Sequence, residues 1–269
     1  MSSIPKYEYF YYFTLSIQNG CLIPGKVTAH FTKQDKIMAF KNQAIGESIL
    51  WWFRDEYWMH RSFQNIEHCL KNGLHKIFSE KVISVFLSRY SIRRTIQAGS
   101  NFEELFTHEL VNTSFLSSVK NGEFEALDQF STMFESSSKS SVKSALSKFA
   151  TLYNPNEYIM YDSRSRKGMH RIRNLISNRL NEKITYAKID IYSNYVKYAK
   201  SLSEEYEDEK LVGLLSNLDK SKVKDFLLQN INAFKLRIVD KWLWLEGYND
   251  IKPSKIKTSD YIDLVNNER

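Results

Sequence analysis

Apolar side chains recur every three to four positions along most of this chain, which is the spacing of amphipathic helices. Between about residues 36 and 134 this pattern predicts four or five helices with short connections, and Gly73, Gly99 and Gly122 fall between them. Between about residues 185 and 248 it predicts three more helices. We therefore expect a mainly helical, all-α fold.

Two stretches depart from the helical pattern. Lys6 to Phe31 is rich in aromatic and β-branched residues and contains turn residues, so we expect a short extended or hairpin-like N-terminal arm. Ser136 to Ser144 carries six serines and is typical of a solvated loop. We expect one compact domain over residues 1–269, made of the arm at 1–35, a helical lobe at 36–135, a central segment at 136–182 and C-terminal helices at 183–269.

Composition limits the classes of partner and site. Lys and Arg number 38 against 31 Asp and Glu, which gives a net charge of +7 and favours a polyanion or an acidic surface as the partner. Two cysteines allow neither a disulfide framework nor a four-thiolate metal site, so a reduced cytoplasmic chain is the simplest interpretation. We expect no signal peptide, and no apolar run reaches the ~18 residues that a membrane span requires.

The segment from Ser144 to Leu180 carries the candidate chemistry. A short helix ends at Asn154-Pro155, an extended apolar run follows over Glu157 to Met160, and Asp162 stands before a basic amphipathic helix. Between residues 164 and 173 that helix has five Lys or Arg and no acid, and a helix N-terminus flanked by such cations can bind phosphate. The candidate contacts are Arg164, Arg166, Lys167, His170 and Arg171. The alternative is a solvated basic face with acidic partners such as Glu204, Glu205, Glu207, Asp208 and Glu209.

Asp162 and Lys148 each have an ordinary and a chemical interpretation. Asp162 is placed to cap the following helix, yet a carboxylate among cations also stays ionised and can stabilise a developing positive charge. Lys148 lies fourteen residues upstream on the short helix, where it is either a surface lysine or a partly buried amine that faces Asp162. Desolvation and neighbouring cations can lower the pKa of such a lysine enough to make it a nucleophile.

This segment resembles the core of the helix-hairpin-helix DNA glycosylases, particularly their 8-oxoguanine branch. Ser147-Lys148 stands where those enzymes have Gly-Thr/Ser-Lys, and Met160-Tyr161-Asp162-Ser163-Arg164 stands at their aspartate turn. The run from Ser147 to Arg164 also resembles a divergent bacterial branch of these glycosylases, in which we expect anti-phage members. The hairpin glycines of the family are absent here, and the serine stretch, with Lys139 and Lys143, stands in their place as a candidate phosphate contact.

The resemblance implies a two-lobed helical enzyme that excises a damaged or modified base from DNA, in base-excision repair or in defence against phage with modified DNA. Asp162 would stabilise the oxocarbenium-like sugar. Lys148 would attack C1′ and form a Schiff base, which permits β-elimination as in a bifunctional glycosylase and AP lyase. If water is the nucleophile instead, the enzyme is monofunctional. Ser147 would lie at the DNA beside Lys148.

An aromatic block precedes this segment in the chain. A glycosylase flips the target base into a pocket walled by aromatic or apolar groups, and one helical segment offers both rings and polar groups. The candidate pocket residues are Trp51, Trp52, Asp55, Tyr57, Trp58 and His60. The alternative is core packing, although adjacent residues of a helix point about 100° apart, so one core cannot bury all of these rings.

Other chemistries have weaker signals. His60, His68 and Cys69 do not form a recognised metal spacing, and the chain has no P-loop or G-x-G-x-x-G, so we expect neither metal nor cofactor. We expect a monomer whose partner is DNA. Two further hypotheses remain open: a non-catalytic helical DNA-binding module, and a helical scaffold that binds an acidic protein surface.

Overall fold

Helices make up most of the structure, a computed structural model that describes residues 33–90, 92, 102–112, 114–138, 142–248 and 256–267. No strand occurs in these ranges, so the predicted all-α fold is confirmed. The predicted N-terminal arm lies outside the described residues except for its last three positions, which begin the first helix. None of the described helices is long and apolar enough to cross a membrane.

The first part of the chain has more helical elements than the four or five predicted. Short breaks and two π-helical turns, which periodicity does not reveal, divide the pattern. Gly73 and Gly122 do end helices, as expected, with φ of 69° and 75°, whereas Gly99 lies outside the described residues. The elements are α1 (Lys33–Trp51), η1 (Trp52–Glu56), α2 (Tyr57–Gln64), α3 (Ile66–Lys71), α4 (His75–Phe78), η2 (Ser79–Ile83), α5 (Ser84–Arg89), α6 (Phe102–Asn112), α7 (Phe115–Asn121) and α8 (Glu125–Ser138).

The second part is also more divided than predicted. The single basic helix expected up to Leu180 is two helices, because the chain turns at Ile172, where φ is −95° and ψ is 9°. Five helices, not three, lie between residues 185 and 248. The elements are α9 (Lys143–Tyr153), α10 (Ser163–Arg171), α11 (Arg173–Leu180), α12 (Tyr186–Asp190), α13 (Tyr192–Ser203), α14 (Asp208–Ser216), α15 (Lys222–Gln229), α16 (Ile231–Glu246) and α17 (Thr258–Asn267).

The predictions for two irregular stretches are partly wrong. The serine stretch is not one loop, because α8 continues to Ser138 and α9 begins at Lys143. The run from Glu157 to Met160 is non-helical but pairs with no strand. Its buried backbone instead bonds to hydroxyl groups: Tyr192 Oη donates to the Ile159 carbonyl over 2.6 Å. Such bonds satisfy polar groups that a buried loop would otherwise leave unpaired.

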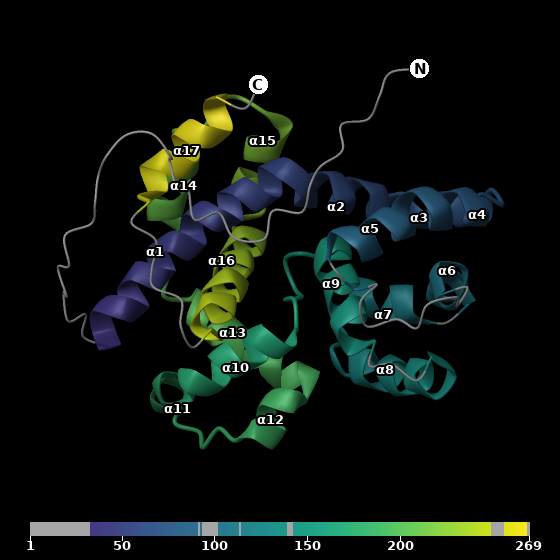
Figure 1. Cartoon of the computed structure of the whole chain (residues 1–269), viewed down its shortest axis with the longest axis horizontal. Coiled ribbons are helices and arrows are strands. Elements are labelled where there is room, and N and C mark those ends of the chain that lie inside the picture. The colour runs from purple at the N-terminus through teal and green to yellow at the C-terminus, as the bar shows by residue number, and fades with distance from the viewer. Residues whose placement is uncertain are drawn as a thin grey trace, which may run out of the picture.

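Helix α16 is the central element (Figure 1). It packs most extensively against α10 and α1, which lie on different sides of it. Helices α2 to α8 form a group on one side of the molecule, while α14, α15 and α17 gather at one end of α1 and α16. Helix α9 contacts α2, α7 and α8, and it leads directly into the segment that precedes α10. One continuous cluster of buried hydrophobic residues extends through both groups of helices.

Candidate active site around Lys148 and Asp162

Asp162 is the N-cap of α10. Its backbone is extended, with φ −137° and ψ 173°, and its Oδ1 accepts the backbone N–H groups of Arg164 and Ser165, each over 2.8 Å. The predicted capping role is therefore confirmed. Capping occupies one carboxylate oxygen only, and within the described residues Oδ2 makes no hydrogen bond. The two backbone bonds hold the carboxylate in place and leave Oδ2 available to a bound molecule.

Lys148 lies on α9, close enough to Asp162 for the two charges to interact. Burial lowers the pKa of Lys148 from its ordinary value, while the carboxylates of Asp162 and Asp240 raise it and the Arg237 guanidinium lowers it. The side chain is half-buried, and its Nζ forms no ion pair or hydrogen bond with any described residue. The amine is thus partly desolvated and lies within electrostatic range of Asp162 and Asp240 without being bound to either.

Ser147 connects the two parts of this site. Its buried Oγ accepts the Tyr161 N–H over 3.0 Å and lies 3.2 Å from the Tyr161 carbonyl oxygen. A residue next to Lys148 in sequence is thereby joined to the residue that precedes Asp162. This link joins α9 to the start of α10.

Charged residues of α16, which sequence reasoning missed, lie behind the site. Arg237 donates to both oxygens of Glu56 and to Asp240 Oδ2, and all three side chains are buried. Asp240 Oδ1 accepts the Ser165 hydroxyl over 3.1 Å. We call Glu56, Arg237, Asp240 and Ser165 the Arg237 cluster. The sequence contains a signal for this cluster, because Arg237 and Asp240 are opposite charges that interrupt an apolar run in the middle of a helix.

Cations and aromatic rings alternate beside the Arg237 cluster. Lys241 Nζ lies 4.1 Å from the ring centroid of Trp51 and 5.9 Å from that of Trp244. The guanidinium carbon of Arg164 lies 5.3 Å from the Trp244 ring centroid and 4.3 Å from that of Tyr248. Burial, and then Arg237 nearby, lowers the pKa of Lys241 to about 8, although Glu47, Glu56 and Asp240 oppose this change. The rings therefore stabilise cations that have little water around them.

The basic helix is neutralised in part. Arg166 donates to Asp190 Oδ1 over 3.1 Å, whereas Arg164 and Lys167 have no acidic partner among the described residues, and Lys167 is exposed. Arg171 donates to the carbonyl groups of Glu246 and Tyr248 at the end of α16. His170 stacks on Tyr186, and burial lowers its pKa.

Three of the five acidic residues considered as partners of the basic helix form ion pairs with cations outside α10. Glu205 pairs with Lys41 and Arg179, Glu207 pairs with Lys210, and Asp208 pairs with Lys235. The positive surface at the start of α10 is therefore not cancelled by that acidic stretch.

The two lysines of the serine stretch differ from each other. Lys143 forms an ion pair with Asp128 and donates to the Asp190 carbonyl, and its Nζ lies 5.0 Å from the ring centroid of Tyr161. Its charge is thus already engaged within the fold. Lys139 lies outside the described residues.

The predicted pocket residues divide into core and surface. Trp52 is 2% exposed and packs on Phe226, as does the half-buried ring of Tyr57. The side chain of His60 is buried, with Nδ1 2.8 Å from the Leu152 carbonyl oxygen, and burial lowers its pKa.

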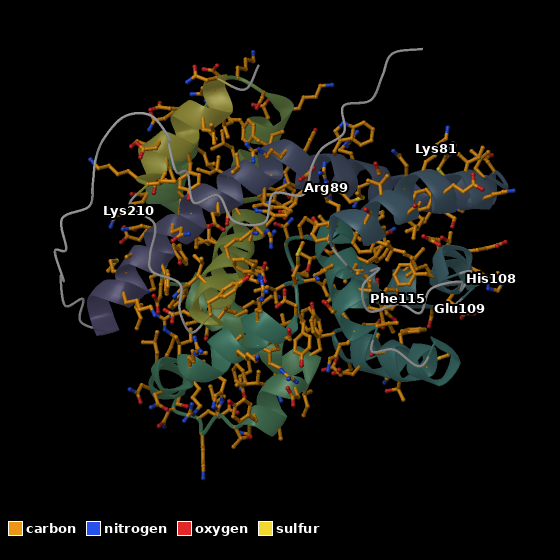
Figure 2. All side chains as sticks on the ribbon, viewed as in Figure 1. Lys81, Arg89, His108, Glu109, Phe115 and Lys210 are labelled. Carbon is orange, nitrogen blue, oxygen red and sulfur yellow. The ribbon has the colours of Figure 1, made fainter. Side chains whose placement is uncertain are left out.

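The other members of the aromatic block reach solvent. Asp55 is half-buried and pairs with Arg89, which Figure 2 labels on α5. Trp58 is 76% exposed, and Trp51 is half-buried beside Lys241. Trp51 therefore connects the aromatic block to the charged residues of α16.

Within the described part of the chain, no group of three or more His, Cys, Asp or Glu side chains is placed to hold a metal ion. The candidate site is therefore built from one amine, several carboxylates and arginines. The chain matches no protein-family model, and no curated protein or solved structure is significantly similar to it.

Proposed function

We propose that this chain is a DNA N-glycosylase that excises a damaged or modified base, and that Lys148 and Asp162 carry the reaction. One observation carries the proposal: a partly desolvated amine without a bonded partner faces a carboxylate whose Oδ1 is held by two backbone N–H groups and whose Oδ2 is unbound. Oδ2 is thus held in place without a bonded partner, and a fixed carboxylate of this kind could stabilise positive charge that develops on a sugar bound there.

The reaction divides between the two residues. The C1′–N bond breaks as the base leaves with the electron pair and then takes up a proton, and Asp162 stabilises the positive charge that develops on the sugar. The neutral amine of Lys148 donates its lone pair to C1′, loses a proton and forms a Schiff base after the sugar ring opens. Because burial lowers the pKa of Lys148, more of the amine is neutral at a given pH.

Cations at the start of α10 support DNA as the partner. Arg164 and Lys167 have no acidic partner among the described residues, and they follow Asp162 directly in the chain. Arg and Lys side chains bind phosphate oxygens, so these two residues would hold the backbone on either side of the target nucleotide. Repair or defence against modified phage DNA, and a reduced cytoplasmic location, belong to this proposal.

Borohydride trapping tests the lysine mechanism. DNA that carries an abasic site is incubated with the protein and reduced, and the covalent adduct is counted by gel and located by mass spectrometry. We expect an adduct on Lys148 that is lost in Lys148→Ala and kept in Lys210→Ala, which removes an exposed lysine of α14, labelled in Figure 2. An adduct of equal yield in both variants contradicts the assignment of Lys148.

Base release tests Asp162 and identifies the substrate. Genomic DNAs of different modification status are incubated with the protein, and free bases are measured by mass spectrometry. Asp162→Asn retains a capping oxygen but loses the charge, so we expect release to fall by a factor of about 100 or more. If Asp162→Asn abolishes release while Lys148→Ala retains it, water is the nucleophile.

A non-catalytic DNA-binding module is the second candidate, because the N-cap bonds of Asp162 serve a helix equally well in a protein without activity. It predicts salt-dependent binding to DNA without release of any base. Absence of DNA binding at low salt would instead favour a scaffold for an acidic protein.

A further inference from the structure

We propose that Asp240 is a positioning residue of the candidate active site: through Ser165 it fixes the start of α10, which orients Asp162, and its charge acts on Lys148. This inference rests on the proposed function for its role in base release. The contacts that carry it lie within the folded chain and can be measured without DNA.

A continuous series of bonds joins Asp240 to Asp162. Asp240 Oδ1 accepts the Ser165 hydroxyl over 3.1 Å, and the backbone N–H of the same serine donates to Asp162 Oδ1 over 2.8 Å. Ser165 is wholly buried, so water cannot replace either partner. A displacement of Asp240 would therefore move the N–H group that holds the Asp162 carboxylate.

Asp240 is itself held firmly. Its second oxygen accepts from Arg237, whose remaining nitrogens donate to Glu56 of η1. The backbones of α10 and α16 are also in contact, because Gly168 of α10 lies directly against the Leu243 carbonyl of α16. The position of Asp162 is thus set from α16, at a contact where the two helix backbones lie close together.

Asp240 also contributes to the electrostatic surroundings of Lys148. The charged groups that act on Lys148 are Asp162 at the start of α10, and Asp240 and Arg237 on α16; the two carboxylates raise the pKa of Lys148 and Arg237 lowers it. Tyr195 of α13 faces the same carboxylates: burial, and then Asp240 and Asp162, raise its pKa. Lys148 consequently has a protonation equilibrium that depends on a residue it does not bond to.

Two substitutions separate the charge of Asp240 from its bond. Asp240→Asn retains an oxygen for the Ser165 hydroxyl and removes the charge, whereas Ser165→Ala retains the charge and removes the bond. Asp225→Asn removes an exposed aspartate of α15, and Ser163→Ala removes an exposed hydroxyl two residues from Ser165, so they are the matched controls. Thermal unfolding establishes that each variant is folded.

The charge is tested on the DNA-free protein. Acetic anhydride acylates neutral amines, so the pH dependence of Lys148 acylation, followed by peptide mass spectrometry, gives the midpoint of its titration. We expect Asp240→Asn to move this midpoint to lower pH by at least about half a unit, since a carboxylate that favours the charged amine is lost. Asp225→Asn should not move it. An unchanged midpoint in folded Asp240→Asn overturns the inference.

The hydrogen bond between Ser165 and Asp240 is tested by amide hydrogen exchange and by the rate of base release. We expect Ser165→Ala, but not Ser163→Ala, to speed amide exchange over residues 163–167 in the DNA-free protein. We expect it to slow base release about tenfold, because a carboxylate displaced by a fraction of an ångström stabilises the transition state less. Unchanged exchange and release in Ser165→Ala also overturn the inference. A wild-type chain that releases no base refutes the proposed function instead, while the Lys148 midpoint and the exchange rates still decide this inference.

Discussion

Gly168→Ala tests whether the close approach of α10 to α16 holds the candidate site together. A Cβ at residue 168 would lie 1.8 Å from the Leu243 carbonyl oxygen, which is part of a helix backbone and also accepts the Gly247 N–H over 2.9 Å. The oxygen cannot turn away without losing that bond, so the two helices must separate. Separation stretches the bond between Ser165 and Asp240, which lies across the same contact.

The expected loss of stability is moderate and measurable. Alanine in place of glycine in a helix gains about 1 kcal/mol, whereas overpacking of a tight contact costs typically ~1–3 kcal/mol and more when backbone must move. We expect a net loss of about 2 kcal/mol. For a chain of this length that corresponds to a fall in Tm of about 4–8 °C.

Gly213→Ala is the matched control, since a Cβ there meets nothing within 4 Å and the residue is also helical. We expect it to raise the free energy of unfolding by ~0.5–1 kcal/mol. Urea unfolding followed by circular dichroism, with calorimetry for Tm, gives both values. If Gly168→Ala is as stable as Gly213→Ala, the helices do not meet as closely as the structure indicates, and the position of Asp162 is not set from α16.

Three further predictions concern single side chains. Burial lowers the pKa of Lys241 from 10.5 to about 8 in the folded chain, so the folded state binds fewer protons than the unfolded state between these pH values. The free energy of unfolding should therefore rise with pH in this range. Lys241→Met should flatten that rise and add ~1–3 kcal/mol at pH 7, measured by urea unfolding at several pH values. Asp162→Ala removes the cap of α10 and should cost about 1 kcal/mol, whereas Asp162→Asn should be nearly neutral in the same assay. Trp52→Ala should cost ~3–5 kcal/mol, whereas Trp58→Ala, at a 76% exposed side chain, should change stability by less than about 0.5 kcal/mol; equal losses would contradict their assignment to core and surface.

Local sequence signals predicted the helical class and the cap correctly. Helical periodicity indicated an all-α fold, and a short acidic residue before an amphipathic run indicated the N-cap at Asp162, because both depend on neighbours in the chain. The same signals could not count the helices. The turn at Ile172 and the π-helical turn after Trp51 leave the apolar periodicity almost unchanged, so a pattern of side chains cannot detect them.

The surroundings of the candidate site depend on contacts between distant residues. Glu56 and Arg237 are 181 positions apart, and no local pattern pairs them. The aromatic block shows the same limit, because Trp52 of η1 is buried and packs on the distant Phe226, while Trp58 of α2 is exposed. The sequence indicates that one core cannot bury every ring, but it does not indicate which ring reaches solvent.

Stability alone does not account for the Arg237 cluster. Buried ion pairs lose much of their attraction to desolvation, and well-packed apolar residues of similar volume are often as stabilising. Burial also raises the pKa of Asp240 to about 6 even though Arg237 opposes this change, so its charge is maintained against the surrounding protein. What apolar residues could not reproduce is a carboxylate that bonds to Ser165, whose backbone N–H in turn holds the Asp162 carboxylate. The cluster is therefore better explained by the position and charge of the groups at the candidate site than by its contribution to folding.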